Sequence, residues 1–185
     1  MESKTPDAFG LTTASACVGK WVKFTSKTTM CRPVCRLEVL LVEDNPGDVR
    51  LVREALKEGR FPGHLNVAMD GDEATDILWR RGVHKDDPRP DLIMLDLNLP
   101  GKNGRTILKE IKTDPDLCRI PVAVFSSSTA PSDLDNAYAS HANCYIRKPT
   151  DLDEYMQVVR SIERFWTSVA TLPRPIGRRG SPAIS

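Results

Sequence analysis

The amino-acid sequence predicts a doubly wound α/β fold, in which helices cover both faces of a parallel sheet. Short apolar segments alternate with segments of helical periodicity five times between residues 37 and 170. The apolar segments are hydrophobic at consecutive positions, which is typical of strands that are buried on both faces. Such an alternation favours parallel strands that are joined by crossover helices.

The first strand and helix have clear boundaries. Residues 38–42 (EVLLV) form the predicted strand, and Asn45 can cap the helix that follows, with Pro46 at its first position. Gly59 is expected to end this helix. Three apolar residues recur within it at helical spacing: Val49, Val52 and Leu56.

The later units follow the same pattern. Further strands are predicted at residues 65–69, 91–95, 121–126 and 144–146. Further helices are predicted at residues 73–81, 105–112, 132–140 and 151–170. The last helix begins with a capping box, because Asp151 and Glu154 have the spacing that satisfies the first backbone N–H groups.

Charge and composition divide the chain into three parts. Residues 37–172 are expected to fold as one domain, whereas residues 1–36 and 173–185 show no convincing period and are expected to be disordered. The predicted domain has 17 Lys and Arg residues against 23 Asp and Glu residues, a net charge of −6. The outer segments carry net charges of +4 and +3. An acidic domain with weakly basic ends argues against a nucleic-acid partner.

Cysteine content and hydropathy bear on location. The chain has five cysteines and no secretory signal, which is typical of a reduced, cytoplasmic protein. No apolar run reaches the roughly 18 residues that a membrane span needs, so no membrane partner is expected. Neither a helix-turn-helix nor an output enzyme is recognisable. We therefore expect either that the output is protein–protein contact or that the domain is a phosphate relay or sink.

Polar residues follow the predicted strands. Because the carboxyl ends of parallel strands meet at one edge of a sheet, these residues are expected to lie close together. They are Glu43 and Asp44 after the first strand, Asp96 after the third, Ser126 at the end of the fourth and Lys148 after the fifth. Each residue alone would be an ordinary loop or cap residue, and the combination is what indicates a site.

These residue types suit phosphoryl transfer. Crowded carboxylates raise one another's pKa unless a cation compensates them, and Mg²⁺ prefers oxygen ligands. Asp96 could then attack phosphorus and form an acyl phosphate. Lys148 and the Ser126 hydroxyl would receive the phosphoryl oxygens.

Four segments resemble the response regulator receiver family. They are LLVEDNPGD (40–48), DLIMLDLNLPGKNG (91–104), PVAVFSSS (121–128) and NCYIRKPTDL (143–152). The resemblance extends over about residues 37–170 and implies a flavodoxin-like (βα)5 fold with strand order 2-1-3-4-5. It implies a signalling protein that catalyses only its own phosphoryl transfer and dephosphorylation, with Asp96 as the acceptor of a phosphoryl group from a histidine kinase.

The resemblance also implies a role for individual residues. Mg²⁺ would be bound by Glu43, Asp44, Asp96 and the backbone carbonyl of Asn98. Ser126 and Lys148 would contact the phosphoryl group, and Ser126 and Tyr145 would form the conformational switch. Many relatives carry Thr where this chain has Ser126, but the hydroxyl group is kept.

One subgroup of the family is especially similar. VEDNPGDVRLVREAL (42–56) and the stretch from residue 143 to residue 166 resemble small regulators associated with bacterial phytochromes. That likeness implies a phytochrome-type histidine kinase as partner, and a homodimer. The last predicted helix is roughly 30 Å long, which exceeds what a small sheet requires, and its apolar surface extends over more than one face. It could simply be a well-buried helix, but we favour the homodimer, in which the surplus apolar surface contacts a second subunit.

Two other functions fit part of the sequence. A receiver-like scaffold that is not phosphorylated would not need its acidic residues and Lys148, which are present here. A Mg²⁺-dependent phosphatase of the haloacid dehalogenase type also uses an Asp at a strand end, but needs a second Asp two residues later. Asn98 occupies that position and cannot transfer the proton.

Overall fold

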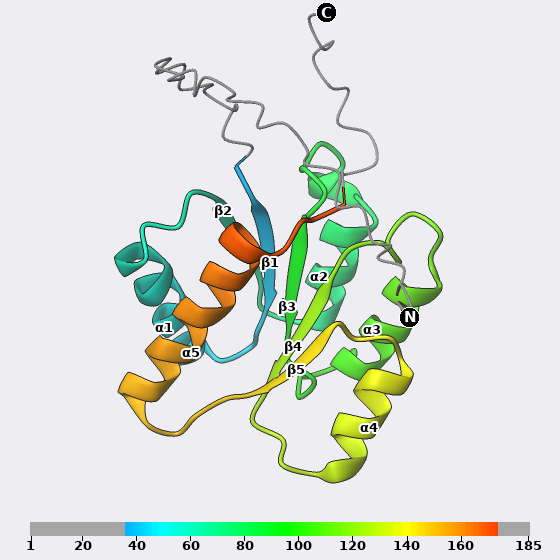
Figure 1. The fold of residues 1–185 in the computed structure, drawn as a ribbon. Coiled ribbons are helices and arrows are strands. Elements are labelled where there is room, and N and C mark those ends of the chain that lie inside the picture. Colours follow the sequence, from blue (N-terminus) through cyan, green and yellow to red (C-terminus); the bar gives the residue numbers. More distant parts are fainter. Residues whose placement is uncertain (1–35, 174–185) are drawn as a thin grey trace, which may run out of the picture. The chain divides into compact units, whose positions relative to one another are not determined.

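A five-stranded parallel sheet lies between two layers of helices in the computed structural model, which describes residues 36–173 (Figure 1). The strands are β1 (Glu38–Val42), β2 (His64–Ala68), β3 (Leu92–Leu95), β4 (Val122–Ser126) and β5 (Cys144–Arg147). Their order in the sheet is β2-β1-β3-β4-β5, and every neighbouring pair is parallel. The doubly wound fold and its strand order are therefore confirmed.

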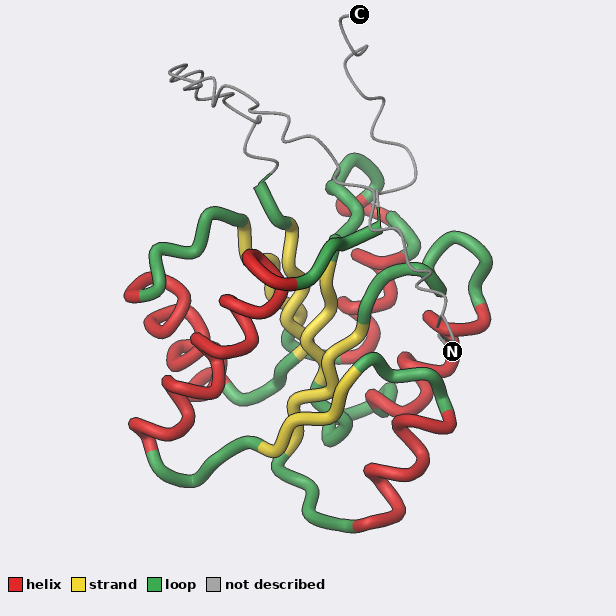
Figure 2. The backbone as a smooth tube through the Cα atoms, viewed as in Figure 1, coloured by secondary structure: helices red, strands yellow, loops and turns green. Residues whose placement is uncertain are grey.

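The helices cover the sheet in two groups. They are α1 (Pro46–Glu58), α2 (Gly71–Leu78), α3 (Gly104–Thr113), α4 (Pro131–Ala139) and α5 (Leu152–Arg164), with a 3₁₀ turn η1 (Gly82–His84) and a π turn η2 (Phe165–Val169). In Figures 1 and 2, α1 and α5 lie on one face of the sheet and the other three helices on the opposite face. The predicted disordered segments, residues 1–36 and 173–185, lie outside the described residues except for Arg36 and Pro173.

All ten predicted strands and helices are present, with two notable changes in their boundaries. Helix α2 begins at Gly71 rather than residue 73, because Asp70 caps it by accepting hydrogen bonds from the backbone N–H groups of Asp72 and Glu73. The last helix is not α-helical up to Ala170, because a π turn follows α5. In that turn the Ala170 N–H donates to the Phe165 carbonyl at 2.8 Å.

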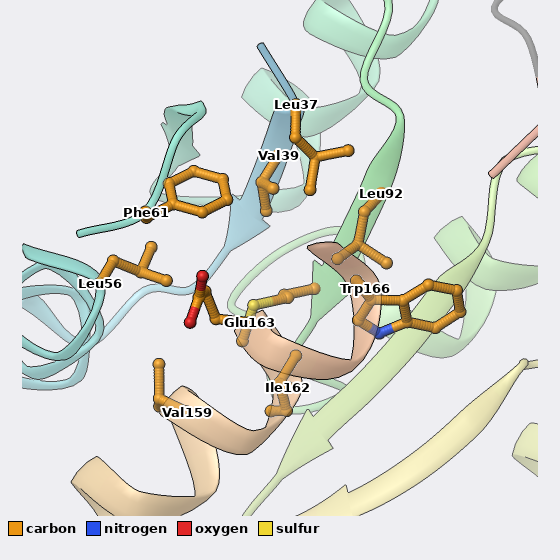
Figure 3. Close-up of a pocket in the computed structure, with 10 residues that line it drawn as sticks. Leu37, Val39, Leu56, Phe61, Leu92, Val159, Ile162, Glu163 and Trp166 are labelled. Carbon is orange, nitrogen blue, oxygen red and sulfur yellow. The ribbon is translucent and has the colours of Figure 1, made fainter. Parts of the chain in front are cut away.

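Each face of the sheet has its own apolar core. Side chains from β1, β3 and β4 alternate between the two cores, since all residues of β3 and β4 are buried. The core under α1 and α5 ends in an apolar pocket at the amino ends of β1 and β3 (Figure 3). Trp166 of the π turn lines this pocket with Ile162 of α5, Leu37 and Leu92. The end of the last helix is thereby packed against the domain.

Helix α3 begins in close contact with the loop that follows β3. Gly104, its first residue, is buried, and a β-carbon at this position would clash with the backbone carbonyl oxygen of Asp96. The nearest atoms are backbone rather than flexible side chain, so they cannot move away without shifting the strand end. Glycine at this position therefore fixes the distance between α3 and Asp96.

The substitution Gly104→Ala should lower the free energy of unfolding by about 1 to 3 kcal/mol, the usual cost of inserting a methyl group into a packed interior. Gly59→Ala is the matched control, because its new methyl group would meet only the flexible carboxylate of Glu163, at 3.2 Å, beyond its own helix. That variant should stay within about 0.5 kcal/mol of the wild type. Urea unfolding measures both, and equal stabilities would contradict the proposed close contact.

Candidate functional site

The polar residues expected from the sequence meet at the carboxyl edge of the sheet. Val42 of β1 pairs with Leu95 of β3, so Glu43 and Asp96 leave neighbouring strands at the same level. The Asp96 N–H donates to the Val42 carbonyl at 3.0 Å, and the Lys148 N–H donates to the Ser126 carbonyl at 3.0 Å. Backbone pairing alone therefore brings these side chains to the same edge of the sheet.

Lys148 lies at the centre of the site. Its ammonium nitrogen Nζ donates to Glu43 Oε2 at 2.6 Å, to Asp96 Oδ2 at 2.6 Å and to Asp48 Oδ2 at 2.8 Å. The side chain is only 6% exposed, and Nζ lies 5.8 Å from the centre of the Phe125 ring. Burial alone would lower the pKa of Lys148, but the hydrogen bonds to its three acidic partners outweigh burial and raise that pKa above its ordinary value.

Both oxygens of the buried Asp96 carboxylate are engaged. Oδ1 accepts hydrogen bonds from the Ser126 hydroxyl at 2.8 Å and from the Asn98 backbone N–H at 2.9 Å, whereas Oδ2 accepts from Lys148. Asp96 is 5% exposed and Ser126 is fully buried. Donors on both sides hold the carboxylate in one orientation, which suits a nucleophile or a ligand that must act in a fixed direction.

Glu43, Asp44 and Asp96 form an acidic cluster. One oxygen from each residue lies within 4.8 Å of the others. Glu43 is almost fully buried, and Asp44 is the most exposed of the three. Burial raises the pKa of Glu43 to about 7, although its hydrogen bond to Lys148 acts in the opposite direction. A single ammonium group cannot compensate all the carboxylates that surround it.

The donor set fits a divalent metal ion. Three carboxylate oxygens close together, with one side open to solvent at Asp44, match the preference of hard cations for oxygen ligands and retained waters. Such a cation would compensate the charge that Lys148 leaves unbalanced. The backbone carbonyl of Asn98 as a further ligand stays a prediction, since the described contacts of Asn98 are made by its N–H and side-chain amide groups.

A chain of hydrogen bonds connects the site to Tyr145. The backbone N–H of Ser128 lies 3.4 Å from the Ser126 hydroxyl, and the Ser128 carbonyl accepts a hydrogen bond from the Tyr145 hydroxyl at 3.1 Å. The Ser128 hydroxyl donates to Asp133 at 2.5 Å, and Asp133 is paired with Arg105 at 2.6 Å. The loop after β4 is thus tied to α3, α4 and β5 at once.

Asp48 was not expected at the site. The sequence places it in the first turn of α1, where an acid is favourable simply because it faces the positive end of the helix dipole. The structure shows that its carboxylate also binds Lys148. The available signal was its position, one helical turn beyond the acidic pair, since the first turn after each strand lies beside the edge of the sheet.

None of the helices within residues 36–173 has both the length and the apolar character that a membrane span requires.

The sequence of this chain is similar to those of known proteins. Residues 39–160 match the response regulator receiver domain. Response regulator Rcp1 of Synechocystis sp. is 45% identical over 135 residues, which cover 73% of this chain and 92% of that protein.

Two crystal structures of cyanobacterial regulators are similar throughout the described domain. The phosphorylated cyanobacterial phytochrome response regulator RcpA has a TM-score of 0.72 and 48% identity, covering 75% of this chain and 99% of that one. The Mn(2+)-bound form of Rcp1 has a TM-score of 0.72 and 44% identity, covering 74% of this chain and 99% of that one. Together with the match over residues 39–160, these likenesses show that the chain belongs to the response regulator receiver family.

Proposed function

We propose that Asp96 accepts a phosphoryl group in a Mg²⁺-dependent reaction and that the resulting change in structure is the signal. The observation that carries this proposal is the orientation of the Asp96 carboxylate, which is held by Lys148 on one oxygen and by Ser126 and the Asn98 N–H on the other. A carboxylate that is buried, oriented and next to a cation site is prepared for nucleophilic attack.

The chemistry follows from these contacts. An Asp96 oxygen attacks phosphorus, the bond from phosphorus to the leaving atom of the donor breaks, and that atom departs with the electron pair. The ammonium of Lys148 and the hydroxyl of Ser126 donate to the phosphoryl oxygens as charge moves onto them. Glu43, Asp44, Asp96 and the Asn98 carbonyl would hold Mg²⁺, which would shield the carboxylates from the incoming phosphate.

The switch follows from the hydrogen bonds of Ser126. A phosphoryl group adds roughly two negative charges and three acceptor oxygens. Ser126 would then donate to the phosphoryl group, and the adjoining loop would move with it. Ser128 of that loop accepts a hydrogen bond from Tyr145 of β5, so the movement changes the surface formed by α4, β5 and α5.

The proposed partners are a kinase and a second copy of the chain. RcpA is a cyanobacterial phytochrome response regulator, which favours a phytochrome-type histidine kinase as phosphoryl donor for this chain as well. A homodimer is supported by apolar side chains that α5 and its π turn leave exposed: Leu152, Phe165 and Val169. The cytoplasmic location indicated by the cysteines stays a prediction.

Among the alternatives, a phosphatase has the least support. The residue two positions after Asp96 is Asn98, which has no carboxyl group to act as an acid, and its backbone N–H is directed at Asp96. A scaffold that is not phosphorylated has more support than a phosphatase, because a buried ion cluster can have a purely structural role. Incubation with a small phosphoryl donor separates such a scaffold from a phosphorylated receiver.

Incubation of the protein with acetyl phosphate and Mg²⁺ should add one phosphoryl group to the intact mass. Asp96→Asn keeps the size of the side chain but removes the nucleophile, so it should show no gain, and a chelator should abolish the gain in the wild type. If the wild type stays unmodified while its native fold is retained, the scaffold function replaces phosphorylation.

Mg²⁺ affinity should fall as the pH is lowered. Burial raises the pKa of Glu43 to about 7, so below that pH a proton competes with the cation and the apparent Kd rises by up to about tenfold per pH unit. In the cation-free protein the same raised pKa means that Glu43 reduces stability as the pH rises from 4.5 to about 7.

Isothermal titration calorimetry at pH 6, 7 and 8 measures this dependence. Glu43→Gln has no carboxyl group to protonate there, so its affinity should be weaker and change less over this range. An affinity of the wild-type protein that does not change between pH 6 and 8 would contradict the assignment of Glu43 as a ligand.

The homodimer makes a separate prediction. Phe165→Glu places a charge on the exposed apolar end of the last helix and should convert a dimer into a monomer in light scattering. Val83→Glu is the control, because Val83 is 89% exposed but belongs to η1 rather than to the last helix. Dissociation by both variants, or by neither, would count against an interface formed by the last helix.

A further inference from the structure

Asp48 differs from the other two carboxylates that bind Lys148. An ammonium group has three N–H donors, and in this structure each has one acceptor, on Glu43, Asp48 or Asp96. Glu43 and Asp96 also belong to the acidic cluster, whose members among the described residues do not include Asp48. Asp48 is therefore the partner of Lys148 that does not also belong to the acidic cluster.

The position of Asp48 is fixed by the start of α1. Asn45 caps this helix by accepting from the Gly47 N–H at 2.8 Å, and Pro46 occupies the first helical position. Val49 and Val52 are buried beneath the same helix. The Asp48 carboxylate thus approaches Lys148 from a rigid helix, whereas Glu43 and Asp96 approach it from the ends of the strands.

We propose that Asp48 is a positioning residue, which keeps the Lys148 ammonium oriented while the other two partners take part in the reaction. The inference rests on the proposed function. When Glu43 and Asp96 hold a cation, and when Asp96 then carries the phosphoryl group, both accept less strongly from Lys148. Asp48 keeps its full charge, so it anchors one N–H while the released N–H groups turn to the phosphoryl oxygens.

The surroundings of Lys148 leave room for this movement. Asp48 and Lys148 line a cavity of about 300 Å³, together with Tyr155 and residues that follow Lys148. Within residues 36–173 the buried Tyr155 hydroxyl has no hydrogen-bond partner, so it does not compete with Asp48 for the Lys148 ammonium. The open space beside the pair lets the flexible Lys148 stem shift its ammonium while the hydrogen bond to Asp48 persists.

The rate of phosphorylation tests whether Asp48 keeps the Lys148 ammonium oriented. With acetyl phosphate and saturating Mg²⁺, Asp48→Ala should lower the maximal rate on the order of tenfold, because a misoriented ammonium stabilises the transferring group less well. Asp48→Asn keeps an oxygen acceptor and should lie between the alanine variant and the wild type. Mg²⁺ affinity should change by less than about threefold in both variants, since Asp48 is not in the acidic cluster.

Glu54→Gln is the matched control for charge. It removes an exposed acid from the same helix without touching the hydrogen bonds of Lys148, and it should react at the wild-type rate. If Asp48→Ala reacts as fast as the wild type or faster, Asp48 competes for Lys148 instead of anchoring it, and the inference is overturned.

A second measurement does not depend on phosphorylation. Hydrogen exchange of the Lys148 ammonium can be followed by NMR in the Mg²⁺-bound protein, with Lys148→Met to assign the signal. We expect a protected ammonium in the wild type and in Asp48→Asn, and exchange at least several-fold faster in Asp48→Ala. Equal protection of the Lys148 ammonium in the wild type and in both variants would overturn the inference that Asp48 positions it. A wild-type protein whose ammonium is protected but which is never phosphorylated would overturn only the proposed function.

Discussion

One ammonium group among three carboxylates is the interaction on which the carboxyl edge of the sheet depends. Lys148 is 6% exposed and binds Glu43, Asp48 and Asp96 at 2.6 to 2.8 Å. Removal of such a buried cation would leave several charges uncompensated, which is far more costly than the loss of an exposed ion pair. Because three acids share one base, the edge keeps an excess of negative charge, and this excess attracts a divalent cation.

The sheet holds this arrangement in place through its backbone. The strands that contribute Asp96 and Ser126 are buried along their whole length, and the register of β1 on β3 sets the separation of Glu43 from Asp96. Asp96 and Ser126 are thus attached to the most deeply buried strands of the domain. The residues proposed to move, Ser128 and Tyr145, lie in a loop and in the strand β5 at the edge of the sheet. The acceptor carboxylate thus follows a central strand, whereas the residues proposed to move lie at one end of the sheet.

Much of this was predictable from the sequence, and the failures have physical causes. Strand ends could be located because apolar runs stop abruptly, and Glu43, Asp96 and Lys148 followed from them. The contact between Asp48 and Lys148 could not be predicted, because it depends on which face of α1 turns toward the site. The hydrogen bond from Tyr145 to Ser128 depends on a side-chain rotamer, and an apolar pattern does not distinguish a π turn from an α turn.

The π turn at the end of α5 has a consequence for protein engineering. It takes up one residue more than an α turn, while Trp166 remains packed in the apolar pocket (Figure 3). Because the π turn accommodates the additional residue locally, deletion of one residue between Phe165 and Val169 should close it to an α turn and leave the chain on either side in place. This turn is therefore a place where the length of the chain can change by one residue while α5 keeps its position on the sheet.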